Sequence, residues 1–222
     1  IMPSLVGSEM CIRDRIYPDQ FIPVLEKNGY VIDVDNFIWN KVCACIKMME
    51  DKGIEPVPIS VNVSRMHVYQ EKFTENLKNM AGEYGIDPKY IPLEITESAF
   101  TKEEGSLFKK VQSLQGYGFK FSMDDFGSGY SSLGMLKSER VDEVKIDKTF
   151  VDDIATDKGK VLLGNVIRMI NELGIDMIAE GVETKEQADF LKENGCMYAQ
   201  GYYYYKPMPI EEFAKLLENS AR

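Results

Sequence analysis

Polar side chains stand at the end of six short apolar segments of this sequence. The segments span residues 59–63, 91–96, 119–123, 141–146, 175–179 and 198–203. The polar residues, in chain order, are Asn62, Glu94, Asp124 with Asp125, Lys145, Glu180 and Gln200. Carboxylate and amide oxygens are hard ligands that suit Mg²⁺ or Mn²⁺ better than zinc. Without a cation, so many carboxylates in one place would repel one another and take up protons.

The adjacent pair Asp124 and Asp125 adds a more specific expectation. Each carboxylate could serve one of two ions roughly 3.5–4 Å apart, an arrangement that activates water and stabilises a phosphoryl transition state. Lys145 could then hold the attacking water or a phosphate oxygen. The loop that begins with this pair reads DDFGSGYSSL over residues 124–133. Its glycines follow two aspartates that would repel a pyrophosphate, so we expect a loop that gates a metal site, not a dinucleotide cradle.

Composition limits the classes of function. The chain has 222 residues, of which 44% are hydrophobic and 28% charged, with a net charge of −10. This is the composition of a folded domain, and its charge argues against binding duplex nucleic acid or an anionic membrane surface. No run of 18 apolar residues exists. The four cysteines lack the spacing of a disulfide framework, which favours a reducing cytoplasm.

Helix signals alternate with the six apolar segments. We expect a helix that Asp33 or Asp35 caps and that ends at Gly53, with Trp39 in the core. A T-x-x-Q capping box at Thr184 begins another helix. Further helices are expected at residues 74–84, around 107–114, at 160–173 and from 209 onward. For His67, the only histidine, we expect a surface or capping role.

This alternation predicts a parallel sheet and an α/β fold. The polar strand ends decide between two architectures. In a TIM-type barrel the carboxyl ends of all strands converge on one face, whereas along a doubly wound sheet six of them could not meet. The sequence therefore favours a (β/α) barrel, with one domain over residues 16–222. Residues 1–15 lack sustained periodicity and resemble a translated sequencing-adapter peptide, so we expect a foreign or disordered leader there.

Six motifs together identify a family resemblance. They are NVS at 62–64, LEITES at 93–98, DDFGSGYSSL at 124–133, VKID at 144–147, AEGVET at 179–184 and QGY at 200–202. Their types, order and spacing resemble the EAL-domain family over about residues 16–220. The resemblance implies a TIM-type barrel that hydrolyses the bacterial second messenger cyclic di-GMP to linear pGpG by metal-activated hydroxide.

The resemblance also implies individual roles. The metal ligands would be Asn62, Glu94, Asp124, Asp125 and Glu180, holding two Mg²⁺ or Mn²⁺ ions. Lys145 would orient the attacking water, Glu180 and Asp125 would take part in catalysis, and Glu97 would anchor the 124–133 loop. Substrate contacts would come from Gln200, Asp147 and Glu183. A homodimer through the barrel, a cytoplasmic location and membrane attachment only through other domains of a parent protein are further expectations.

One departure from the family keeps alternatives open. The Glu-Ala-Leu motif that names the family should lie upstream of Pro18 and is not found there. The spacing from Glu9 to Arg13 imitates it by chance. We therefore expect an incomplete barrel that lacks its first strands, with unpaired sheet edges and doubtful activity. A non-catalytic module that binds cyclic di-GMP or a protein is the first alternative, and an enolase-like barrel is the second.

Overall fold

A parallel sheet of six strands forms the centre of the molecule, for which a computed structural model describes residues 18–96, 104–127, 136 and 141–220. All strands are parallel, and each pairs with the next strand along the chain. The six predicted strands are thereby confirmed in order and number. They are β1 (Val61–Asn62), β2 (Leu93–Thr96), β3 (Phe121–Phe126), β4 (Glu143–Ile146), β5 (Asp176–Ala179) and β6 (Tyr198–Ala199).

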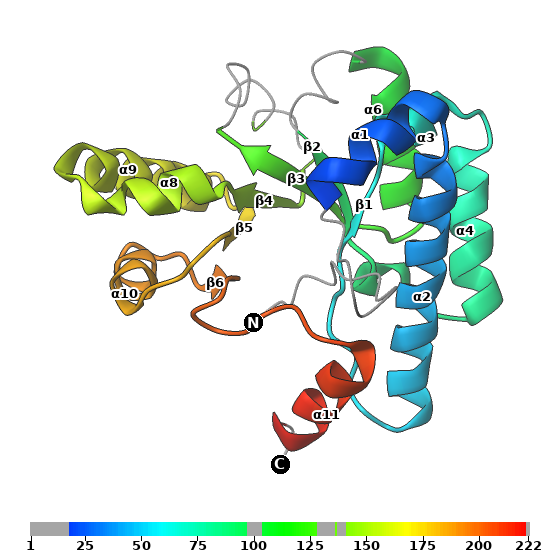
Figure 1. Ribbon diagram of the computed structural model, residues 1–222. Coiled ribbons are helices and arrows are strands. Elements are labelled where there is room, and N and C mark those ends of the chain that lie inside the picture. The colour runs from blue at the N-terminus through cyan, green and yellow to red at the C-terminus, as the bar shows by residue number, and fades with distance from the viewer. Residues whose placement is uncertain (1–17, 97–103, 128–135, 137–140, 221–222) are drawn as a thin grey trace.

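Helices cover the outside of this sheet (Figure 1). Beside β1–β3 lie α2, α4 and α6, which contact one another in that order, and beside β4–β6 lie α8, α9 and α10. The helices are α1 (Pro18–Asn28), α2 (Val31–Asp51), α3 (Arg65–Tyr69), α4 (Phe73–Tyr84), α6 (Glu104–Gln115), α8 (Lys148–Asp152), α9 (Asp157–Glu172), α10 (Lys185–Glu193) and α11 (Ile210–Ser220). Two short 3₁₀ helices, η1 (Pro88–Tyr90) and η2 (Asp153–Ala155), complete the described elements.

Strand order that follows chain order, with helices in the connections from β1 to β2, β2 to β3, β4 to β5 and β5 to β6, is the arrangement of a TIM-type barrel. The predicted fold class is therefore confirmed as α/β with a barrel-type parallel sheet. Within the described residues, β1 and β6 each pair with a single neighbouring strand. No helix in the described part of the chain combines the length and apolar character that crossing a bilayer requires.

One hydrophobic cluster lies between the sheet and the helices. Leu93, Ile95 and Val144 are fully buried strand residues, and α2 and α9 contribute residues such as Ile46 and Ile167. Burying each such side chain is worth about 1.5–3 kcal/mol. The polar residues of the same strands alternate with these apolar ones and so point to the barrel interior. The hydrophobic alternation thus places the charged side chains inside.

Several local expectations need correction. The helix α2 begins at Val31 after Tyr30, and Asp35 is not its cap but a buried residue inside it. The pattern failed to predict α1, α3 and α8, because helices of five residues carry too little periodicity and α1 contains Pro23. The predicted segment 198–203 forms a strand over two residues only. The capping box of Thr184 with Gln187 is confirmed.

Candidate active site

The Lys145 ammonium stands at the centre of the polar barrel interior. Lys145 extends from β4 with 5% of its surface exposed. Its Nζ lies 2.6 Å from Glu94 Oε1 on β2 and 2.8 Å from Glu180 Oε1 just after β5. These distances are those of charge-assisted hydrogen bonds. Three residues that sequence reasoning selected from separate strand ends are therefore in direct contact.

A bulge in β3 explains how both neighbouring aspartates serve one site. In a regular strand, adjacent side chains point to opposite faces. The register between β3 and β4 shifts between Met123 and Phe126, and Asp125 takes a positive φ of 56°. Asp124 Oδ1 accepts a hydrogen bond of 3.0 Å from the Asp125 N–H. Both carboxylates consequently interact electrostatically with Lys145 and Glu94. Strained backbone of this kind concentrates at functional sites.

Glu180 is held from a second side by Gln200. The Gln200 Nε2 donates a hydrogen bond of 2.5 Å to Glu180 Oε1, the same oxygen that faces Lys145. Backbone bonds fix the neighbouring segment, since Gln200 N donates to Ala179 O and Val182 N donates to Gln200 O. Gly201 allows this approach, because a Cβ there would lie 2.1 Å from Val182 O. One carboxylate oxygen thus has both an ammonium and an amide as partners.

Negative charge is in excess at this site. Glu94, Asp124, Asp125 and Glu180 carry four carboxylates against the one ammonium of Lys145, a net of −3 when all are ionised. Burial, together with neighbouring carboxylates, raises the pKa of Asp124 to about 7 against the attraction of Lys145. Burial likewise raises the pKa of Asp125 and Glu180. For Lys145, burial lowers the pKa, but Glu94, Glu180 and Asp124 outweigh it and raise the pKa overall.

The chemistry and charge of these side chains can be compared with what a bound divalent cation requires. The donor set consists of oxygen atoms, and a cation would favour the ionised form of Asp124, whose pKa is raised by burial and, to a smaller extent, by the neighbouring carboxylates. The residues therefore fit Mg²⁺ or Mn²⁺ in chemistry. Their present spacing differs from that of a closed metal cage, since within the described ranges no three acidic, histidine or cysteine side chains are placed to hold one ion. Lys145 lies between Glu94 and Glu180, so holding an ion requires these side chains to move.

The other predicted site residues occupy the rim. Asn62 is the register partner of Glu94 on the neighbouring strand, and its side chain is exposed. Asp147 follows β4 and caps α8 by accepting a hydrogen bond of 2.8 Å from Thr149 N. It also raises the pKa of Asp125, which places it beside the site. Glu183 is exposed and pairs with Lys148.

Some predictions fall on residues outside the described ranges. They concern Glu97 as the loop anchor, residues 128–133 of the expected gating loop and the leader at 1–15. For the loop, the described part ends at Gly127.

Sequence reasoning missed two interior polar residues and misjudged a third. Glu143 lies two positions before Lys145 on β4 and shares its face, and burial raises the pKa of its carboxyl. Ser122 is fully buried on β3 and is the register partner of both Glu94 and Glu143. The period of two from Lys145 and Asp124 could have identified both. His67, expected at the surface or at a cap, is 2% exposed in α3.

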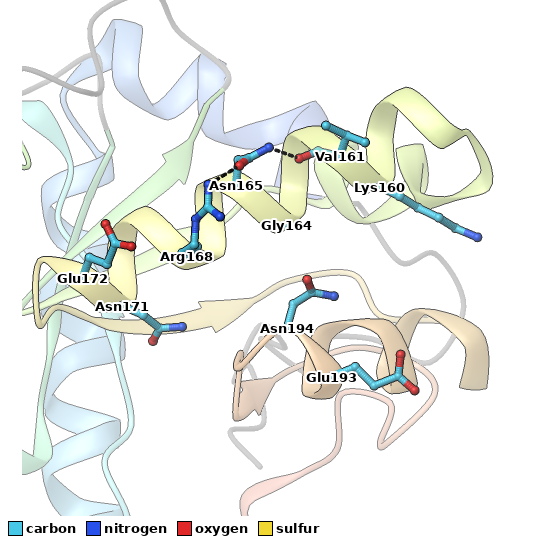
Figure 2. A pocket seen from close by; sticks show the side chains of 9 residues that line it. All are labelled: Lys160, Val161, Gly164, Asn165, Arg168, Asn171, Glu172, Glu193 and Asn194. Carbon is cyan, nitrogen blue, oxygen red and sulfur yellow. Dashed lines mark hydrogen bonds between the residues drawn. The ribbon is translucent and has the colours of Figure 1, made fainter.

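A separate groove lies in the outer helix layer. It has a volume of about 640 Å³ and lies between α9 and α10 (Figure 2). Polar side chains line it, and Arg168 donates a hydrogen bond of 2.7 Å to Asn165 Oδ1 on its wall. None of the predicted site residues belongs to this groove. The candidate active site is therefore the polar interior around Lys145.

A barrel-type parallel sheet with acidic residues and a lysine at its carboxyl ends places the candidate site where β/α barrels carry their active sites. The chain belongs to the EAL domain family, whose model matches residues 12–207. The signaling protein YkoW of Bacillus subtilis is 34% identical over 222 residues, which cover 96% of this chain and 28% of that protein. The probable cyclic di-GMP phosphodiesterase PdeG of Escherichia coli is 33% identical over 203 residues, covering 91% of this chain and 40% of that protein.

A solved structure extends the similarity to three dimensions. The PaMucR phosphodiesterase, in its complex with c-di-GMP, superposes with a TM-score of 0.86 at 28% sequence identity. The match covers 96% of this chain and 90% of the PaMucR chain. By contrast, this chain spans well under half the length of the curated relatives it matches, 28% of YkoW and 40% of PdeG.

Proposed function

We propose that this chain is a metal-dependent phosphodiesterase that hydrolyses cyclic di-GMP to linear pGpG. The observation that carries the proposal is the contact of Lys145 with Glu94 and Glu180 beside the Asp124–Asp125 pair. The EAL family, the relatives named as cyclic di-GMP phosphodiesterases and the PaMucR complex with c-di-GMP support the choice of substrate.

The residues that would hold Mg²⁺ or Mn²⁺ are Asn62, Glu94, Asp124, Asp125 and Glu180, with both aspartates available for a pair of ions. When bound, such cations lower the pKa of water and neutralise negative charge on the phosphodiester. They would also allow an acidic domain to bind a dianionic dinucleotide.

The protein's own groups have complementary tasks in this proposal. The Lys145 ammonium, kept protonated by its acidic neighbours, holds the attacking water or a phosphate oxygen by hydrogen bonding. Gln200 fixes the orientation of Glu180, which serves as the base with Asp125. Buried strands around Lys145 limit the access of other water, which strengthens these interactions. Gln200, Asp147 and Glu183 are proposed to contact the substrate at the rim.

The decisive experiment is a chromatographic assay of cyclic di-GMP with added Mg²⁺ or Mn²⁺. We expect pGpG to appear only in the presence of a divalent cation, and Glu180→Gln to abolish it. Lys185→Met, which removes an exposed surface partner of Asp189, is the matched control and should retain wild-type turnover. If the folded protein yields no pGpG with either metal, the catalytic proposal is wrong.

The spacing of the acidic groups favours one second candidate, a module that binds cyclic di-GMP without hydrolysing it. No metal-spaced triad of acidic side chains exists within the described part of the structure. Calorimetry in Ca²⁺ together with the assay above distinguishes the two functions. Binding without pGpG formation in Mg²⁺ or Mn²⁺ would favour the module.

Two properties of the molecule in the cell are also proposed. The buried free thiols of Cys43, Cys45 and Cys196 suit a reducing cytoplasm. Subcellular fractionation of cells that express the natural gene product would test this location.

Homodimerisation through the barrel rests on the family resemblance. Light scattering coupled to size-exclusion chromatography should give twice the mass of the 25.3 kDa chain, and a single-chain mass would contradict it.

A further inference from the structure

A second buried polar cluster lies directly behind the strand that carries Asn62. Its members are Asp35 and Trp39 of α2 and His67 of α3, whose exposed fractions are 6%, 2% and 2%. Asp35 and Trp39 are four positions apart and therefore share one face of α2. A buried carboxylate inside a helix is costly unless it is satisfied by partners. The contacts of this cluster show what it holds in place.

Three hydrogen bonds fix the backbone at and after Asn62. The Trp39 indole Nε1 donates a bond of 3.0 Å to the carbonyl oxygen of Asn62. Val63 N donates 2.9 Å to the carbonyl oxygen of Glu94, another residue of the candidate site. Ser64 N then donates 3.1 Å to Asp35 Oδ2. Because β1 has only two residues, side chains from α2 supply bonds that a longer strand would make to its neighbours.

His67 completes the cluster. Its Nε2 lies 3.3 Å from Asp35 Oδ2, within ion-pair distance although not aligned for a hydrogen bond. Its ring centre is 4.4 Å from that of Trp39. His67 N also donates a bond of 3.0 Å to the carbonyl oxygen of Ser64. The histidine thus supports both α2 residues and the segment that they hold.

We propose that Asp35, Trp39 and His67 are positioning residues that set the affinity of the site for a divalent cation by fixing Asn62. This inference rests on the proposed function, in which Asn62 is a metal ligand. A shift of the backbone by a fraction of an ångström would move the Asn62 amide relative to Glu94 and Asp124. Loss of partners that orient a metal ligand typically weakens metal affinity about 10–100-fold.

The test uses Trp39→Phe, which removes the indole N–H and keeps an aromatic ring. Binding of Mn²⁺ to the full chain, without nucleotide, is followed by electron paramagnetic resonance of the free ion, and thermal unfolding is recorded in parallel. We expect the Mn²⁺ dissociation constant to rise about 10-fold. Cys43→Ala, a buried residue of the same helix, is the control. It should lower the unfolding temperature and leave Mn²⁺ binding unchanged.

A double-variant cycle separates positioning from general destabilisation. If Trp39 acts through Asn62, adding Trp39→Phe to Asn62→Ala should cause no further loss of Mn²⁺ affinity. Asp35 provides an independent pair of variants should Trp39→Phe not fold. Asp35→Asn retains an acceptor for Ser64 N and should bind Mn²⁺ almost as the wild type does, whereas Asp35→Ser is too short and should bind it more weakly.

Each outcome has a defined meaning. Wild-type Mn²⁺ affinity in Trp39→Phe, or an equal loss with and without Asn62, would overturn the inference. An unchanged affinity in Asn62→Ala would overturn it too, while the proposed metal site could still stand on the carboxylates. If the wild-type chain binds no Mn²⁺ at all, the metal proposal itself fails and the inference fails with it.

Discussion

The molecule contains two buried polar clusters that differ in their charge balance. Around Lys145, four carboxylates meet a single ammonium, and burial with mutual repulsion raises the pKa of Asp124 to about 7. Around Asp35, one carboxylate has a histidine and a backbone N–H as partners. The first cluster holds three more carboxylates than ammonium groups, whereas the second holds a single carboxylate that accepts a hydrogen bond from Ser64 N and lies within ion-pair distance of His67. Several buried carboxylates with raised pKa values mark a candidate functional site, whereas the contacts of the lone carboxylate are those of a residue that fixes the backbone.

Replacing Lys145 should have the largest effect on stability and turnover of the variants described here. Lys145→Met leaves Glu94 and Glu180 buried without their cation, so we expect a loss of about 3 kcal/mol in the free energy of unfolding without metal. Turnover of cyclic di-GMP should fall about 10²–10³-fold, as when a group that stabilises a transition state is removed. Urea unfolding and the pGpG assay measure the two effects. Stability and turnover equal to those of Lys185→Met would show that the central ammonium is dispensable.

The raised pKa of Asp124 should make the stability of the metal-free protein depend on pH. Because the folded-state pKa of Asp124 lies at about 7 instead of 3.8, the folded protein binds this proton more tightly than the unfolded chain does. Its contribution to stability is complete below about pH 4 and is lost as the pH rises through about 7. In a chelator at pH 8, Asp124→Asn should therefore be more stable than the wild type by a few kcal/mol, at about 1.4 kcal/mol per pKa unit.

Denaturant unfolding of Asp124→Asn and wild type between pH 4 and 8 tests this expectation. The free energies of unfolding of the two proteins should agree near pH 4, diverge progressively as the pH rises to about 7, and differ by a constant amount above it. Added Mn²⁺ should stabilise the wild type more than the variant, because it neutralises the carboxylate. A constant difference in the free energy of unfolding across this pH range would contradict a raised pKa of Asp124 in the folded protein.

The cluster of Asp35, Trp39 and His67 should respond differently when one of its members is replaced. His67→Phe keeps a ring against Trp39 and removes the Nε2 that lies 3.3 Å from Asp35 Oδ2, so we expect a loss of about 1 kcal/mol in the free energy of unfolding. Unlike Asp124→Asn, this variant should destabilise the protein, because it removes a partner and relieves no repulsion. Denaturant unfolding measures the change. A gain in the free energy of unfolding would mean that the contact of Asp35 with His67 destabilises the folded protein.

A helix cap that belongs to neither cluster gives the smallest expected effect and a reference for the others. The Thr184 side chain accepts a hydrogen bond of 3.2 Å from Gln187 N at the start of α10. Thr184→Ala should cost about 1 kcal/mol of stability and leave both the Mn²⁺ dissociation constant and turnover unchanged. Thermal unfolding, the Mn²⁺ binding measurement and the pGpG assay check these three expectations. A change in Mn²⁺ binding here would show that any destabilisation disturbs the site.

The sequence predicted much of the fold because its signals were local. Six apolar runs indicated six parallel strands, which the structure confirms. The polar residues at their ends are Asn62, Glu94, Asp124, Lys145, Glu180 and Gln200. The capping box at Thr184 could be predicted for the same reason, since its partners are three residues apart in the sequence. Short helices such as α8 were missed, because a cap by Asp147 and five residues carry no periodic pattern.

The roles of Asp35 and His67 could not be predicted, since they depend on contacts distant in sequence. Asp35 looked like a helix cap because acidic residues are frequent there, yet it binds Ser64, which lies 29 residues away. His67 looked like a surface residue because nothing near it in sequence suggested burial against Trp39. Glu143 was overlooked although its spacing of two from Lys145 placed it on the same face.

The sequence by itself determined which functional groups stand at the ends of the parallel strands, namely carboxylates, amides and one ammonium, because residue type and period are local properties. Only the tertiary structure decided how these groups meet. It set Lys145 between Glu94 and Glu180, turned Asp124 and Asp125 toward one site through a bulge, and tied Asn62 to α2. The physical reason is that burial and repulsion, which displace a pKa or fix a ligand, arise only when residues far apart in the chain share one dry interior.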